Sequence, residues 1–392
     1  MLPNATPAAP ATPSSGRILS FEEYSQRSYF ASLDGLRALA ILLVIFHHVP
    51  RSLADPLHSF YQNGRYGVSL FFLVSGYLIC TLFLREEKQR GAISLTSFYA
   101  RRAIRLFPLY YLVLGVQTAA VFATNMYQPE SVVLFAEKLP SYIFYYSNLL
   151  PTATDGPFFF AWSLAVEEQF YLWFGFAIVF LSRRVLIALV VSALVIKVAC
   201  YNLFGPLDAQ AQVYRVIFSY REPLLVGVLL GFALNRRDLY EKLVVPLARR
   251  GVGVTLGLLC VGFLAVHPMT SATSWDGLLL LAVMALITVA VLSRSSVPVL
   301  NNPVVAHYGK VSYGIYLMHM FVVEVVERLI PAHAHLLHFA LTAIVTGILA
   351  MLSFALFEVP IISFFRRRRE RSARSAMPSK ASLPLASGGA SA

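Results

Sequence analysis

Residues 66–84 read YGVSLFFLVSGYLICTLFL, an apolar stretch without a charged side chain. A helix of about 20 such residues is long enough to cross the hydrocarbon core of a bilayer. Ten stretches of comparable length and character recur along the chain and predict an all-α polytopic membrane protein with about ten transmembrane helices, at 36–50, 66–84, 103–124, 160–181, 186–204, 218–234, 251–266, 275–293, 309–330 and 337–358. The segment 141–150 is apolar but too short to span, and we interpret it as interfacial or re-entrant.

The composition agrees with a membrane protein. Hydrophobic residues make up 57% of the 392 residues and charged residues 13%, against about 45–50% and about 25% in soluble domains. This excludes a soluble enzyme, a disordered chain and a disulfide-framed secreted domain. The net charge of +12 indicates cytoplasmic loops rich in Lys and Arg, so we expect no nucleic-acid partner. Cys80, Cys200 and Cys260 lie far apart in apolar segments, so no metal site is expected.

The distribution of Lys and Arg predicts the orientation of the chain in the membrane. Basic residues concentrate before the first predicted span, in the loops after the even-numbered spans and in the C-terminal tail. Both termini are therefore predicted to be cytoplasmic, at the cell membrane. We expect a disordered N-terminal segment (1–30), a membrane domain (31–365) and a basic, disordered tail (366–392).

Charged and polar residues inside the spans need a reason, because a charge at the bilayer centre costs at least about 2.5–3.5 kcal/mol. Arg37 and His48 are 11 residues apart in SLDGLRALAILLVIFHHV (32–49), close to three helical turns, so they share a face that His47 does not. A neutral imidazole at that depth could accept a proton. Alternatively, Arg37 only reaches back to the membrane surface and His48 only bonds a neighbouring helix.

A second polar cluster lies in TSFYARRAIRLFPLYY (96–111) at a predicted cytoplasmic surface. Arg102 and Arg105 share one helix face, and Arg101 is adjacent. Three guanidinium groups suit a phosphorylated ligand. The alternative is a topology anchor or a contact with anionic lipid.

A third cluster, in WSLAVEEQFYLWF (162–174), places Glu167 and Glu168 at a depth similar to that of His48. Adjacent helical residues point about 100° apart, so at most one acid faces a given pocket. Interhelical hydrogen bonding or an ion pair is the alternative reason for these acids.

The remaining polar positions form one stripe and several small-residue contacts. Ser312, Tyr316 and His319 lie on a single helix face, which could line a pocket or join two helices. Ser75 and Gly76, like Gly227 and Gly231, are more typical of close helix packing.

Together these strings resemble the acyltransferase-3 family of membrane O-acyltransferases. The matching stretches are LDGLRALAILLVIFHH, GVSLFFLVSGYLI, RRAIRLFPLYY, WSLAVEEQFY, VSYGIYLMH and FEVPI. The resemblance assigns the family's Arg-x10-His pattern to Arg37 and His48, and its Arg-x-x-Arg pattern to Arg102 and Arg105. The family glutamate falls on Glu167.

The resemblance implies transfer of an acyl group, commonly acetyl, from acyl-CoA to a hydroxyl of a carbohydrate or a glycosylated metabolite, with no bound cofactor. His48 is then general base or transient acyl carrier, Glu167 and Arg37 assist, and Arg101, Arg102 and Arg105 bind the donor. Candidate lining residues are Asp34, Ser75, Trp162, Glu168, Ser312, Tyr316 and His319.

Two alternatives to an acyltransferase remain open: a transporter or flippase of a sugar-linked or lipid-linked substrate, and a non-catalytic membrane scaffold. Some family members carry a fused periplasmic esterase-like domain, and residues 366–392 are too few to fold as one. We therefore expect a stand-alone enzyme or one with a separate periplasmic partner.

Overall fold

The structure is a computed structural model that describes residues 16–27, 29–50, 57–124, 126–151, 155–204, 221–247, 249, 251–266, 275–331 and 333–375. Helices dominate the described part of the chain, where an isolated antiparallel bridge joins Ile18 to Arg294. The first helices are α1 (Phe21–Gln26), α2 (Ala31–His48), α3 (His58–Asn63), α4 (Tyr66–Arg90), α5 (Leu95–Ala123), α6 (Pro129–Ile143), the short turn η1 (Ser147–Leu149), α7 (Ala161–Phe180) and α8 (Arg183–Phe204).

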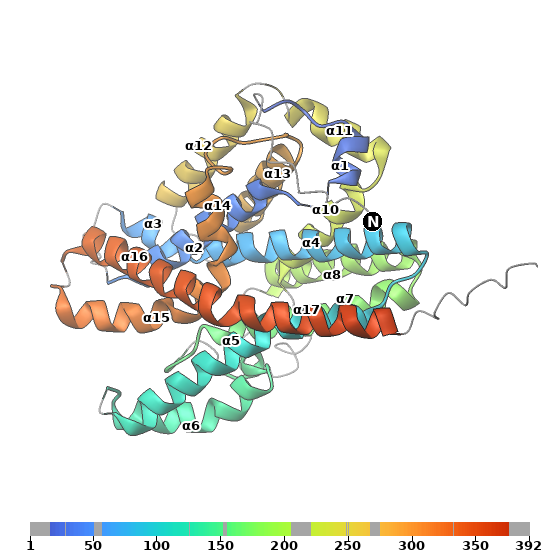
Figure 1. The fold of residues 1–392 in the computed structure, drawn as a ribbon. Helices are drawn as coiled ribbons and strands as arrows, with labels where there is room; N and C mark the ends of the chain where they lie inside the picture. The colour runs from blue at the N-terminus through green and yellow to red at the C-terminus, as the bar shows by residue number, and fades with distance from the viewer. Residues whose placement is uncertain are drawn as a thin grey trace, which may run out of the picture.

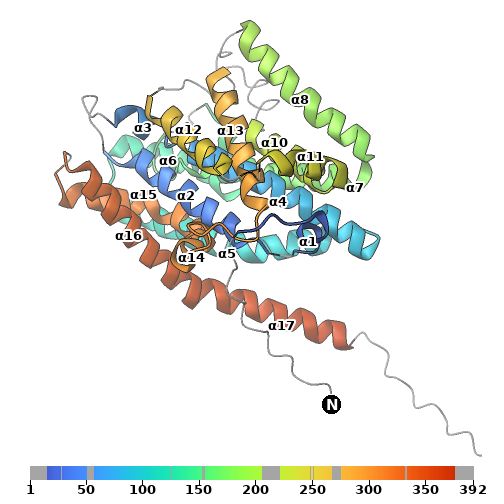
Figure 2. The same cartoon turned by 90° about the horizontal axis from the view of Figure 1, so that it is seen from above.

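The second half continues in the same manner. It contains α10 (Glu222–Leu234), α11 (Arg237–Leu247), α12 (Val252–Val266), α13 (Trp275–Leu292), α14 (Pro303–Lys310), α15 (Ser312–Leu329), α16 (His335–Ser353), the π-helical turn η2 (Phe354–Glu358) and α17 (Val359–Ser375). Helices α16 and α17 follow one another along the length of the molecule, and α2 and α4 lie among the surrounding helices (Figure 1). Helix α1 and the far end of α17 lie at the same end as the last turn of α4 (Figures 1 and 2).

Each of the ten predicted spans coincides with a helix in the described residues, although residues 218–220 lie outside them. By length and composition alone, six helical runs of the described chain can cross a membrane, or up to seven if the bent pair α11 and α12 counts as one span. Helices α7 and α15 fall short of that test although they fill predicted spans. They carry ionisable groups in place of apolar ones, Glu167 and Glu168 in α7 and three near the end of α15.

The expected close packing at glycines is confirmed where α4 crosses α10. A Cβ atom on Gly76 would lie 2.1 Å from the carbonyl oxygen of Leu224, and one on Gly227 would lie 2.2 Å from that of Leu73. The two backbones therefore touch at this crossing, which is possible only where neither helix has a side chain. The contact fixes α4, one wall of the cavity described below.

The structure corrects the prediction of disorder at both ends of the membrane domain. Ser20 and Glu23 form a reciprocal capping box that starts α1, and Tyr24 is completely buried. At the other end, α17 carries the helix through residues 366–375, because Arg is a good helix former and α16 and η2 lead directly into it. Residues 1–15 and 376–392, also predicted to be disordered, lie outside the described residues.

Candidate functional site

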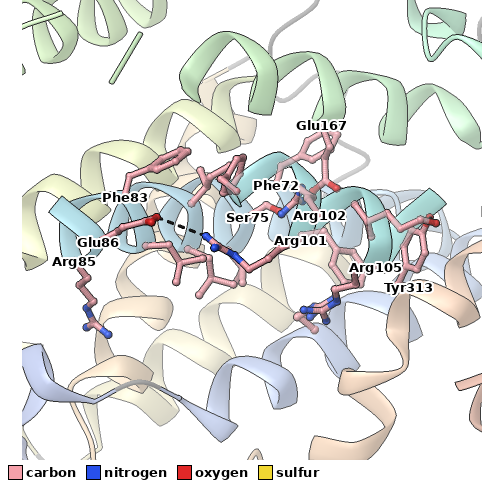
Figure 3. A pocket seen from close by; sticks show the side chains of 18 of the residues that line it. Phe72, Ser75, Phe83, Arg85, Glu86, Arg101, Arg102, Arg105, Glu167 and Tyr313 are labelled. Atoms are coloured by element: carbon pink, nitrogen blue, oxygen red, sulfur yellow. Dashed lines mark hydrogen bonds and ion pairs between the residues drawn. The ribbon is translucent and has the colours of Figure 1, made fainter. Parts of the chain in front are cut away.

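A cavity of about 700 Å³ lies among α1, α2, α4, α5, α7 and α15, which is within the range of small-molecule sites. We call it the arginine cavity, because seven arginines line it: Arg27, Arg37, Arg85, Arg90, Arg101, Arg102 and Arg105. Two acids, Glu86 and Glu167, line it as well. Figure 3 shows the side chains of α4, α5 and α7 converging on this space.

Helix α5 brings three of these arginines into the cavity from successive turns: Arg101, Arg102 and Arg105. Ser94 caps the helix by accepting from the backbone N–H of Ser97, which fixes where it begins. Arg101 approaches Glu86 to 3.6 Å. Arg105 is exposed to the cavity and makes no hydrogen bond or ion pair with any residue that the structure describes. Among the three arginines, the Arg105 guanidinium therefore has the fewest interactions with the described residues.

Arg102 is held more tightly than its neighbours. Its guanidinium carbon lies 3.3 Å from the centroid of the Tyr171 ring, and its Nε lies 3.7 Å from Oε1 of Glu168. The Tyr171 hydroxyl is in turn 2.5 Å from the Ser75 hydroxyl on α4. The chain Ser75–Tyr171–Arg102 joins three helices and orients one cation towards the cavity.

Arg37 of α2 lines the same cavity. Asp34, one turn earlier, lies 3.8 Å from Arg37 and accepts a hydrogen bond of 2.6 Å from the Tyr29 hydroxyl. Asp34 thus orients Arg37 without lining the cavity itself. A clustered set of cations with few acids is suited to bind a phosphorylated ligand.

The two adjacent acids of α7 are directed to different partners. Glu167 lines the cavity, whereas Glu168 pairs with Arg102 from outside the set of lining residues. Trp162, five residues before Glu167, is also absent from that set, and the guanidinium carbon of Arg221 lies 4.7 Å from its ring centroid.

The inner end of the arginine cavity is formed by α7 and α15. The Ser163 and Tyr316 hydroxyls are 2.6 Å apart, and the Tyr316 hydroxyl donates to the carbonyl oxygen of Phe160 at 3.0 Å. Ser312 lies on the same face of α15 and also lines the cavity. Beyond the Tyr316 ring, the lining residues end.

His48 and His319 lie beyond that end and not in the cavity itself. Their ring centroids are 5.0 Å apart, and His319 is also 5.4 Å from the Tyr316 ring. We call these two residues the histidine pair. Arg37 and His48 both lie on α2, but Arg37 lines the arginine cavity and His48 does not.

Both imidazoles of the histidine pair are oriented by main-chain carbonyls. Nδ1 of His48 is 2.8 Å from the Val44 carbonyl oxygen, and Nδ1 of His319 is 2.6 Å from that of Tyr316. A neutral imidazole that donates through Nδ1 has its lone pair on Nε2. Nε2 of the fully buried His319 has no hydrogen-bond partner among the described residues. The His47 ring centroid is also 5.0 Å from that of His48, but its Nδ1 donates to the Tyr61 carbonyl oxygen at 2.9 Å.

Sequence reasoning missed Arg27, Arg85 and Arg90 at the cavity mouth. Arg85 and Arg90 follow the apolar run of α4 directly, so the abrupt change to charged residues was the available signal. Arg27 follows α1, and the only sequence signal for that helix was the capping box of Ser20 and Glu23 in a segment whose composition is typical of disorder. In the described part of the chain, no group of three His, Cys, Asp or Glu residues is placed to hold a metal ion.

Comparisons with known proteins identify the family of the chain. The acyltransferase-3 family model, described as an acyltransferase domain, matches residues 30–359. The peptidoglycan O-acetyltransferase of Listeria monocytogenes is 29% identical over 375 residues, covering 88% of this chain and 58% of that protein. An O-acetyltransferase of Staphylococcus aureus is 28% identical over 368 residues, covering 86% and 58%. The chain thus spans little more than half the length of these relatives. No solved structure matches it.

Proposed function

This chain belongs to the acyltransferase-3 family of multi-pass membrane proteins, and from that premise we propose that it moves an acyl group from acyl-CoA to a hydroxyl of a carbohydrate or glycosylated metabolite. The group is most simply acetyl, as in the names of the relatives. The observation that carries the proposal is the arginine cavity, because few metabolites besides a coenzyme A thioester combine several phosphates with an acyl group.

In the proposed complex, the donor lies along the arginine cavity with its phosphates on the arginines. Figure 3 shows Arg101 directed towards Glu86 near the end of α4, Arg102 beside Glu167, and Arg105 towards Tyr313 of α15, and Arg37 lines the same cavity. Bidentate contacts from guanidinium to phosphate would fix the donor's position. The acyl end then points towards Ser163 and Tyr316, the part of the cavity that is next to the histidine pair.

The proposed reaction has the acceptor hydroxyl approach from the opposite side of the membrane. Nε2 of His48 removes the hydroxyl proton, the oxygen attacks the thioester carbonyl and the C–S bond breaks. The coenzyme A thiolate leaves and takes up the proton, so that the products are an ester and a thiol. In the second form of the mechanism, His48 first accepts the acyl group and then passes it to the hydroxyl. Glu167 orients the acceptor or the reacting groups, and Arg37 assists donor binding.

The proposal includes ten membrane spans with both termini in the cytoplasm. The charge distribution supports this orientation, and so does the position of α1 and the end of α17 at one end of the molecule. Reporter fusions are expected to place the 125–158 loop outside and the 235–250 loop inside. A cytoplasmic signal from the 125–158 loop would contradict the orientation and the side from which the donor enters.

The acceptor proposed is a cell-envelope carbohydrate, because one relative is a peptidoglycan O-acetyltransferase. A separate periplasmic protein would be the partner that receives or presents it. The protein is assayed in nanodiscs with radiolabelled acetyl-CoA and candidate carbohydrates, with His48→Ala as the control variant. Acyl transfer that needs His48 supports the proposal. Movement of carbohydrate across the membrane without thioester consumption would favour a transporter instead.

A further inference from the structure

The residues 16–27, which we call the N-terminal segment, precede the part of the chain matched by the family, yet they are bound firmly to the membrane domain. The Leu19 N–H donates to the Ser293 carbonyl oxygen at 2.8 Å, and the Tyr240 hydroxyl donates to the Leu19 carbonyl oxygen at 3.0 Å. The buried Tyr24 and Tyr77 hydroxyls are 2.6 Å apart. These contacts join the segment to α4, α11 and the chain after α13.

The N-terminal segment also forms one wall of the arginine cavity, to which it contributes Ser25, Gln26 and Arg27. Arg85 of α4 donates to the carbonyl oxygens of Tyr24, at 3.0 Å, and of Arg27. Arg27 itself donates to the Ser295 carbonyl oxygen at 2.8 Å. Arg27 and Arg85 therefore use their guanidinium groups to bind the segment in place, whereas Arg105 presents its guanidinium to the cavity.

Gln26 is the exposed residue at the end of α1 and lines the mouth of the cavity, as does the exposed Gln89 of α4. An amide side chain both donates and accepts hydrogen bonds, whereas a guanidinium group only donates. Adenine presents a donor amine beside an acceptor nitrogen, the pattern that amides recognise. The mouth thus offers neutral groups suited to a nucleobase at the end of the cavity opposite Tyr316.

We propose that the N-terminal segment forms the nucleotide end of the donor site, where Gln26, together with Gln89, hydrogen-bonds the adenosine part of coenzyme A. This inference rests on the proposed function. The acyl end must lie near Ser163 and Tyr316 to react, so the nucleotide lies at the mouth. The segment then lets the protein distinguish a coenzyme A thioester from a phosphopantetheine thioester, which lacks the nucleotide.

Titration calorimetry on the full chain in nanodiscs tests this inference with two probes, coenzyme A and 4′-phosphopantetheine. Gln26→Ala is expected to weaken coenzyme A binding by about 3- to 10-fold, the value of a hydrogen bond or two, and to leave phosphopantetheine binding unchanged. Gln89→Ala should act in the same direction. Gln128→Ala is the matched control, because Gln128 is an exposed amide at the start of α6 that does not line the cavity.

The outcomes separate this inference from the proposed function. If the wild type binds coenzyme A and Gln26→Ala binds both probes as the wild type does, the inference is wrong and the proposed function stands. An equal loss for both probes would also overturn it, because the effect would not depend on the nucleotide. If the wild type binds neither probe, the proposed function fails and the inference fails with it.

Discussion

The arginine cavity and the histidine pair are neighbours with opposite properties. The cavity holds about 700 Å³ and is lined by seven guanidinium groups, whereas His319 is buried without any exposed surface and both imidazoles donate to main-chain carbonyls. A large anion needs accessible cations, and a general base needs an unprotonated nitrogen held in place. In the proposed mechanism these two needs are met in two places, and Tyr316 borders both, because it lines the cavity and lies 5.4 Å from the His319 ring.

This separation predicts that donor binding and the chemical step can be altered independently. Variants of the cavity should change mainly the affinity for acyl-CoA, and variants of the histidine pair should change mainly kcat. Variants that change both quantities equally would indicate that the two regions act as one site.

The largest effect is expected from His48→Ala. Loss of a general base typically costs about 10²–10⁴ in rate, while acyl-CoA binding should stay unchanged because His48 does not line the arginine cavity. His47→Ala is the matched control and should be much milder, since His47 bonds the Tyr61 carbonyl oxygen towards α3. Acyl transfer and donor binding are both measured on purified protein. A fully active His48→Ala protein would end this mechanism.

Glu167→Gln is expected to lower kcat by about 10²-fold, the order of loss when a reacting group is misplaced by an ångström. Glu168→Gln, the control at the adjacent position, should lower it less and should instead weaken donor binding, because Glu168 holds Arg102 from outside the cavity lining and does not compete with the donor there. The same Glu-to-Gln change at these two adjacent positions therefore tests the chemical step and donor binding separately. Equal effects of the two variants on kcat and on donor affinity would contradict the division of roles.

Arg105→Ala is expected to weaken donor binding by about 10- to 100-fold, the range for charge-assisted hydrogen bonds. Arg105→Lys should rescue only part of the loss, since an ammonium group cannot make the bidentate contact. Binding of acyl-CoA is measured by calorimetry. The Arg102→Ala variant should behave similarly. If both variants bind the donor normally and only accumulate poorly, the arginines are a topology anchor.

The sequence predicted local features well and three-dimensional boundaries poorly. Apolar runs and helical periodicity depend on neighbouring residues, so the ten helical segments could be predicted, as could the grouping of Arg102 with Arg105. The surroundings of His48 depend on α15, which brings His319 to 5.0 Å from it although the two residues are 271 positions apart along the chain. Helix α1 was missed because a short capping box was outweighed by the Pro/Ala/Thr/Ser-rich residues before it.

The smallest effect is expected from Glu86→Gln at the cavity mouth. Glu86 lies 3.3 Å from Arg90 and 3.6 Å from Arg101, and Figure 3 shows it directed towards Arg101. A donor phosphate has to compete with this carboxylate for both guanidinium groups. Ion pairs with an exposed partner contribute about 0.2–1 kcal/mol, and here both arginines are about half exposed or more, at 62% and 47%, whereas the Glu86 side chain is 11% exposed.

Removing the charge of Glu86 should therefore tighten acyl-CoA binding by about 2- to 5-fold and leave kcat unchanged. Calorimetry at low and high salt checks the cause, because screening should shrink the difference between Glu86→Gln and the wild type. Weaker donor binding in Glu86→Gln would mean that the carboxylate positions Arg101 for the phosphates and does not compete with them. In that case Glu86 would orient Arg101 for the donor, as Asp34 orients Arg37.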